Sequence, residues 1–165
     1  AHIYGEFMSS IKQSVRAYLT HHYGEYDLQY GTTLETRILT ELLKRDEHLR
    51  TFYYEICSTG LEFDSDVIYK FYKLHIDTYN LAFSEDEIKL IQTTVVGAGI
   101  GIIKKMIEGY FSCDEETIFN FRIRTMYKLM NVSDERVNEI LNETKKIFDQ
   151  MKFEIENYFI FTLEM

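Results

Sequence analysis

Proline and tryptophan are both absent from this chain of 165 residues, and it contains only eight glycines. Proline and glycine are the residues that most often interrupt regular structure, so their scarcity favours long helices over many short strands. Apolar residues make up 45% of the chain and aromatic residues 15%, which argues against disorder. We therefore expect one all-α domain spanning residues 1–165.

Basic residues are also scarce. Eighteen Lys and Arg stand against 27 Asp and Glu, which gives a net charge of −9. Non-specific binding of nucleic acid is largely electrostatic, so this balance argues against the chain gripping a phosphate backbone by itself. Anionic membrane surfaces are disfavoured for the same reason.

Only two cysteines occur, Cys57 and Cys113, far apart and in no metal-binding spacing. A disulfide framework is not expected, and free thiols fit a cytoplasmic protein. No signal peptide opens the chain, and the apolar run of residues 95–103 is expected to be too short and too closely flanked by lysines to cross a membrane. The start, Ala-His-Ile, falls within a helical pattern and indicates a piece of a longer protein or the loss of an initiator methionine.

The spacing of apolar residues predicts about seven helices. Their expected ranges are 2–23, from 26–32 to 45, 46–60, 66–82, 84–109, 112–130 and from 133 onwards. Predicted caps are Asp46, Asp64 or Ser65, Ser84 paired with Glu87, Ser112 paired with Glu115, and Ser133. Residues 153–163 fit either a further helical stripe or, at FIFTL, an edge strand, and we expect helix.

The helix that contains residues 88–110 is apolar on nearly every side and carries three glycines near its centre. A helix of this kind must be covered all round, and glycines four residues apart allow another backbone to approach closely. The next helix also has two apolar sides, so the pair predicts a four-helix interface with a second copy. The alternative is a pair that is central in a monomer. The predicted interface residues are Val95, Gly97, Ala98, Gly101, Ile102, Ile118, Phe121 and Thr125.

A stripe of aromatic residues with polar tips suggests the wall of a ligand cavity. Ile68, Tyr72, His75 and Tyr79 share one helical face, and a second face, with Val67 and Leu74, is expected to point inward too. The alternative is plain core whose hydroxyl groups reach water. The predicted wall for a small, mostly apolar ligand comprises Tyr30, Leu34, Arg37, Phe52, Tyr53, Ile56, Ile68, Tyr72, His75, Tyr79, Thr93 and Thr94.

Catalytic and metal-binding motifs are absent from the sequence. The GAGIG run has neither the preceding strand nor the following lysine of a phosphate loop. No Glu-x-x-His, H-E-x-x-H or G-x-S-x-G occurs. We therefore expect no enzyme, no metal and no cofactor.

Three stretches together resemble the C-terminal regulatory domain of the TetR/AcrR family of transcriptional repressors. The helix that leaves the family's DNA-binding head resembles AHIYGEFMSSIKQSVRAYL, its long middle helix resembles TRILTELLKRDEHLRTFYYEI, and its dimerisation helices resemble TTVVGAGIGIIKKMIEGYFSCDEETI. The family's N-terminal helix-turn-helix is not found in this chain. Residues 152–165 extend beyond the family's usual ending.

The resemblance implies a homodimeric, inducer-sensing domain that contacts DNA only through a missing N-terminal helix-turn-helix. Ligand entry would then change the spacing of two DNA-binding heads, because the ligand prefers one of two states. The alternative from another class is a helical protein-interaction module without a small-molecule site.

Overall fold

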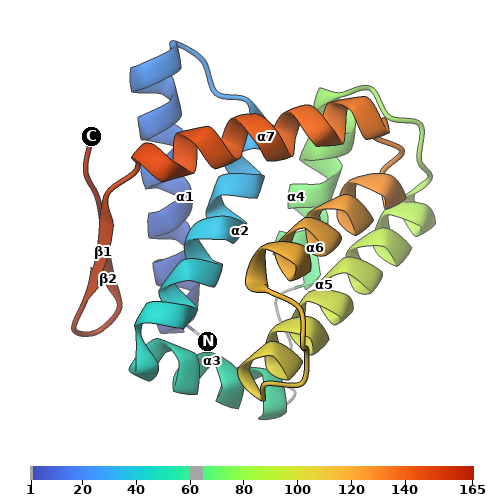
Figure 1. The fold of residues 1–165 in the computed structure, drawn as a ribbon. Coiled ribbons are helices and arrows are strands. Elements are labelled where there is room, and N and C mark those ends of the chain that lie inside the picture. Colours follow the sequence, from blue (N-terminus) through green and yellow to red (C-terminus); the bar gives the residue numbers. More distant parts are fainter. Residues whose placement is uncertain (1, 60–64) are drawn as a thin grey trace. The chain divides into compact units, whose positions relative to one another are not determined.

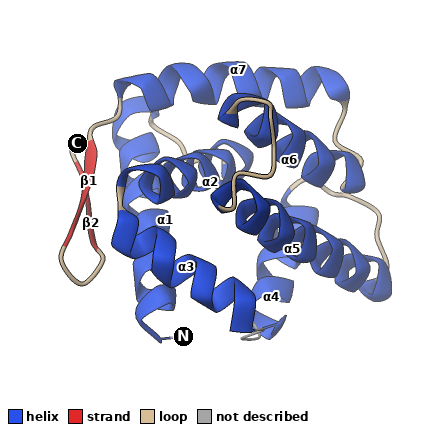
Figure 2. Cartoon of the chain, turned by 60° about the horizontal axis from the view of Figure 1, so that its bottom comes forward, coloured by secondary structure: helices blue, strands red, loops and turns tan. Residues whose placement is uncertain are grey.

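The structure is a computed structural model that describes residues 2–59 and 65–165 (Figure 1). In the described residues it has seven helices and one two-stranded sheet, which confirms the all-α prediction (Figure 2). The elements are α1 (His2–Tyr23), α2 (Leu28–Arg45), α3 (Glu47–Thr59), α4 (Ser65–Thr78), α5 (Glu85–Ile107), α6 (Glu115–Leu129), α7 (Asp134–Gln150), β1 (Phe153–Glu156) and β2 (Ile160–Leu163).

The chain divides into two compact units. Unit 1 comprises Ala1–Phe52 and Asn138–Met165, and unit 2 comprises Tyr53–Val137. The boundaries fall within α3 and near the start of α7. Whether residues 1–165 act as one domain stays a prediction, and each unit is described by itself below.

In unit 1, α1 packs along α2 and against β2. The helical stripe of α1, including Phe7, Ile11 and Val15, is buried, as are Leu34 and Ile38 of α2. Burial of this spacing on two helices is the expected result of a 3.6-residue period.

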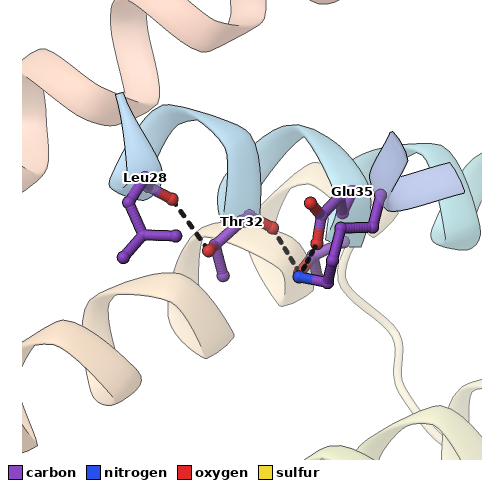
Figure 3. A network of polar contacts seen from close by, with 5 residues as sticks. Leu28, Thr32 and Glu35 are labelled. Carbon is purple, nitrogen blue, oxygen red and sulfur yellow. Dashed lines mark hydrogen bonds and ion pairs between the residues drawn. The ribbon is translucent and has the colours of Figure 1, made fainter. Parts of the chain in front are cut away.

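Polar contacts join the same two helices. Lys12 Nζ of α1 donates to Glu35 Oε2 of α2 at 3.1 Å, and the Glu35 side chain is only 10% exposed. Thr32 Oγ1 donates to the Leu28 carbonyl one turn back at 2.8 Å, so its hydroxyl is satisfied within α2 (Figure 3). Unit 1 therefore buries an acidic group between α1 and α2.

Asp46 joins α2 to α3. Its N–H donates to the Leu42 carbonyl at 2.9 Å, which closes α2, and its Oδ1 accepts from the Leu49 N–H at 2.8 Å, which caps α3. The predicted cap is thus confirmed. The proposed stop at Gly60 lies outside the described residues.

The end of the chain is a β-hairpin, so the helix expected over residues 153–163 was wrong. β1 and β2 pair antiparallel, with Phe153 opposite Leu163 and Glu156 opposite Ile160. Phe153 and Phe161 are buried, and their ring centroids lie 6.0 Å apart. The hairpin buries this aromatic pair within unit 1, which outweighs the weak helical stripe.

In unit 2, α4 packs on α5 and α5 packs on α6. The prediction of a second inward face on α4 was wrong, because Val67 is 61% exposed and Leu74 is 56% exposed. The helix also ends at Thr78 instead of near residue 82. Asn80 takes a positive φ of 52°, and the Leu81 N–H donates to the Ile76 carbonyl at 2.9 Å, an arrangement that closes a helix.

Most of the predicted ends of the last three helices are confirmed. The Ser84–Glu87 capping box is present, Gly109 follows α5 with φ 73°, and Ser133 Oγ accepts from the Arg136 N–H at 3.2 Å. The second box at Ser112 was wrong. Asp114 caps α6 instead, and its Oδ1 accepts from the Thr117 N–H at 2.8 Å. The opening at Asp64 lies outside the described residues.

Candidate functional site

The aromatic cluster of unit 2 is built on α4. Tyr72 and His75 are buried, and the His75 side chain is only 1% exposed. The His75 ring centroid lies 5.0 Å from that of Tyr79 and 5.8 Å from that of Tyr127 on α6. His75 and Tyr79 therefore lie together, Tyr72 lies one turn earlier on α4, and Tyr127 is a further member that the sequence analysis missed.

Burial controls the chemistry of this cluster. Burial raises the pKa of the Tyr72 phenol well above its ordinary value, so the hydroxyl stays neutral throughout the physiological range. A neutral phenol beside an imidazole can orient a polar group by hydrogen bonding, but it supplies no strong nucleophile or base. The cluster is thus suited either to line a ligand-binding site or to form a core whose polar groups are hydrogen-bonded.

Four of the twelve predicted ligand residues belong to unit 1 and have structural contacts there. Tyr30 Oη donates to Glu139 Oε1 at 3.3 Å, Arg37 lies over the Phe148 ring at 5.6 Å, and Phe52 lies 5.1 Å from Phe159. Leu34 is fully buried. These contacts account for the four side chains as packing within unit 1.

The other eight predicted residues lie in unit 2 and do not share one environment. Tyr53 and Ile56 of α3 are buried, and Ile68 of α4 is partly exposed. Thr93 and Thr94 of α5 are exposed. The Thr93 hydroxyl donates to the Lys89 carbonyl at 2.7 Å. Because both threonines lie on the exposed side of α5, the structure places them apart from the buried Tyr72 and His75.

That exposed side of α5 is the second feature of unit 2. Exposed residues recur along the helix at three- and four-residue spacing, and the apolar Leu90 is 68% exposed. We call this set the α5 face; it comprises Leu90, Thr93, Thr94, Gly97, Ala98 and Gly101. The buried residues of α5 are Ile88, Ile91, Gln92 and Ile103, four of its 23. A long apolar helix is thus largely uncovered by its own chain.

The glycines of α5 differ in their surroundings. A Cβ added at Gly97 or Gly101 would meet nothing within 4 Å, whereas one added at Gly99 would lie 3.3 Å from Arg122 Nη2 of α6. Only Gly99 is therefore explained by packing within the chain. The small residues of the α5 face have no such explanation among the described residues.

The remaining predicted interface residues differ in how exposed they are. Phe121 of α6 is 62% exposed, and Val95, Ile102 and Thr125 are partly exposed. Ile118 is buried in its own chain and can contribute little to a contact. The interface predicted from sequence is thus available in all but one position.

The length of α5 bears on whether this helix could cross a membrane. It is the one helix among the described residues that is long and apolar enough, by length and composition alone, to cross a bilayer. The helix has 23 residues in all and extends beyond both ends of the apolar run of residues 95–103, so the expectation that this segment does not cross a membrane stays a prediction. The absence of a membrane partner stays a prediction.

No group of three or more potential metal ligands occurs among the described residues. Burial raises the pKa of the Cys57 thiol above its ordinary value, which makes it a poorer nucleophile. Cys113 is exposed.

Comparison with known proteins identifies no relative: no family model, no curated protein and no solved structure matches the chain. The resemblance to TetR-like regulatory domains therefore stays a prediction from the sequence pattern.

The structure also contains a cavity of about 700 Å³ in unit 1, and none of the twelve predicted ligand residues lines it. Its walls come from α1, the start of α3 and the hairpin. Sequence reasoning missed it because one wall was expected to be helical.

Proposed function

We propose that this chain is the ligand-sensing and dimerising part of a TetR-like transcriptional repressor. Operator DNA would be contacted by a helix-turn-helix outside these residues. The observation that carries the proposal is the α5 face, which combines exposed apolar area with small residues at helical spacing. Exposed apolar surface of this kind is typical of a protein–protein contact.

A second copy suits the α5 face better than an unrelated partner. Gly97 lies near the middle of α5, so two copies crossing there would overlap along the whole helix. The first turn carries Glu85, Asp86 and Glu87, and the last turn carries Lys104 and Lys105. A twofold axis perpendicular to the two helices would make the pair antiparallel and set each acidic end against the basic end of its mate.

Ligand sensing would use the aromatic cluster of Tyr72, His75 and Tyr79. In support, the buried Tyr72 and His75 of α4 combine apolar bodies with a neutral phenol and an imidazole, and Tyr79 directly follows that helix. The same burial also favours the second candidate, a helical interaction module whose interior is filled. The two functions share the dimer and differ in the response to ligand. A thermal shift across a panel of lipophilic compounds, abolished by Tyr72→Phe, would favour the sensor.

Substitution of Gly97 tests the dimer. We expect Gly97→Leu to weaken association at least tenfold, because a leucine would separate the two backbones. It should not unfold the monomer, since a Cβ there meets nothing within 4 Å and leucine is favoured over glycine in helices by about 0.5–1 kcal/mol. Sedimentation velocity over a concentration series measures the change.

Gly5→Leu is the matched control. Gly5 is also an exposed glycine within a helix, and a Cβ there also meets nothing within 4 Å. It should leave association unchanged. Equal association of the unaltered chain and Gly97→Leu would show that α5 is not the contact.

A further inference from the structure

The cavity of unit 1 is an open groove between three segments that are distant in sequence. The first turns of α1, the start of α3 and the β1–β2 hairpin line its volume of about 700 Å³. We call it the hairpin groove. Small-molecule sites commonly enclose about 300–1,000 Å³, so a drug-sized compound would fit.

One side of the hairpin groove is aromatic. Phe7 and Phe161 line it and are buried, and Phe159 lies with its ring centroid 6.1 Å from that of Phe7. The ring centroid of Phe52 lies 5.1 Å from that of Phe159, although Phe52 does not line the groove. Of the three Phe rings that line the groove, Phe159 is the one that is partly exposed and can contact an occupant, whereas Phe7 and Phe161 are buried.

The turn that carries Phe159 is held in an unfavourable backbone conformation. Tyr158 and Phe159 have φ values of 64° and 58°, a region that bulky residues rarely adopt. Tyr158 is 92% exposed, so its own packing does not explain the conformation. Tyr158 and Phe159 lie in the tight turn between β1 and β2, and such hairpin turns require positive φ at their central residues. The turn directs Phe159 towards Phe7 and Phe52.

The polar lining of the hairpin groove is acidic. Glu6, Asp46 and Glu156 contribute carboxylates from three different segments, and no lysine or arginine is among the lining residues. The Asp46 carboxylate is held in place by the Leu49 N–H. Aromatic rings next to carboxylates attract cations and repel anions.

We propose that the hairpin groove binds an organic cation with an aromatic or branched aliphatic body, such as a quaternary or protonated amine. The body would lie against Phe159, and the positive charge would face Glu6 and Glu156. The site lies wholly within unit 1, so it does not depend on the dimer or on the proposed regulatory function.

Benzyltriethylammonium titrated into the full chain tests this proposal, with 4-tert-butylbenzoate as an aromatic anion of similar size. Calorimetry should detect one site for the cation and none for the anion. In methyl NMR spectra, the signals of Ile3, Ile155 and Ile160 should move, whereas that of Ile123 in unit 2 should not. No binding, equal binding of the anion, or larger shifts at Ile123 would overturn the proposal.

A pair of double variants separates the groove from the general negative charge of the chain. Glu6→Gln with Glu156→Gln should weaken binding of the cation about five- to tenfold, as expected for the loss of two partly solvated charges. Glu25→Gln with Glu154→Gln makes the same change in net charge at exposed positions outside the groove and should have no effect. Equal losses in both would overturn the proposal, and the methyl shifts of the unaltered chain decide alone if either variant fails to fold.

Discussion

Glu35 is a buried acidic residue of unit 1 whose burial alters its pKa. Its carboxylate is buried between α1 and α2, and the side chain of Lys12, with which it forms an ion pair, is about half exposed at 47%. Burial raises the pKa of Glu35, and the neighbouring Lys12 opposes that effect only in part. The charged form of Glu35 is thus less favourable in the folded chain than in the unfolded one.

This shift predicts a pH dependence of stability. Below the unfolded-state pKa both states are protonated, and Glu35 contributes no slope. As pH rises from that value through the raised folded-state pKa, the native state binds more protons than the unfolded state, so the free energy of unfolding falls. We expect Glu35→Gln to lack this fall, as measured by urea denaturation between pH 4 and 7. An identical pH slope in the variant would contradict the assignment.

At the scale of single residues, the sequence predicted contacts best where helical spacing decides them. Tyr72, His75 and Tyr79 were expected on one face, and of these His75 and Tyr79 do lie together. Thr93 was expected in the ligand wall because it is polar in an apolar helix. Its hydroxyl instead bonds back to Lys89, a local solution that leaves the side chain free to face outward.

Helix starts are decided at the scale of the element, and two serines provide a direct comparison. Ser84 Oγ accepts from the Glu87 N–H at 3.2 Å, and the Glu87 carboxylate accepts from the Ser84 N–H at 2.6 Å. Ser112 begins a similar Ser-x-x-Glu pattern, but Asp114, two residues later, caps α6 instead.

We expect Ser84→Ala to lower the free energy of unfolding by about 1 kcal/mol, the usual cost of losing a cap. Ser112→Ala, the same substitution at the other serine, should leave the free energy of unfolding almost unchanged. Chemical denaturation of both variants beside the unaltered chain measures the difference. Equal losses would mean that Ser112 caps α6 after all.

The helices could be predicted because their signals are local, and the hairpin could not. The apolar spacing and the capping residues of each helix lie within its own segment, as does Gly109 at the end of α5. These local signals predict most of the helix boundaries. Residues 153–163 fit both a helix and a strand, and packing of Phe153 against Phe148 and Phe161 decides between them. The prediction that α4 has a second buried face was wrong for the same reason, because the sequence does not say which neighbours a helix has.

At the scale of the whole molecule, the hairpin groove illustrates what sequence reasoning cannot reach. Its walls combine residues near position 3, near position 46 and near position 158, and no periodicity joins them. The α5 face is the opposite case, because one continuous helix contains the whole pattern. Its small and apolar residues were predicted to be covered by a second copy, and its exposure in the single chain leaves room for that partner.

The molar mass of the unaltered chain in solution tests this account most directly. Sedimentation equilibrium at micromolar concentrations should give twice the monomer mass of 19.7 kDa, with dissociation only on dilution. A mass that stays at 19.7 kDa across the concentration range would contradict the pairing of α5 with a second copy.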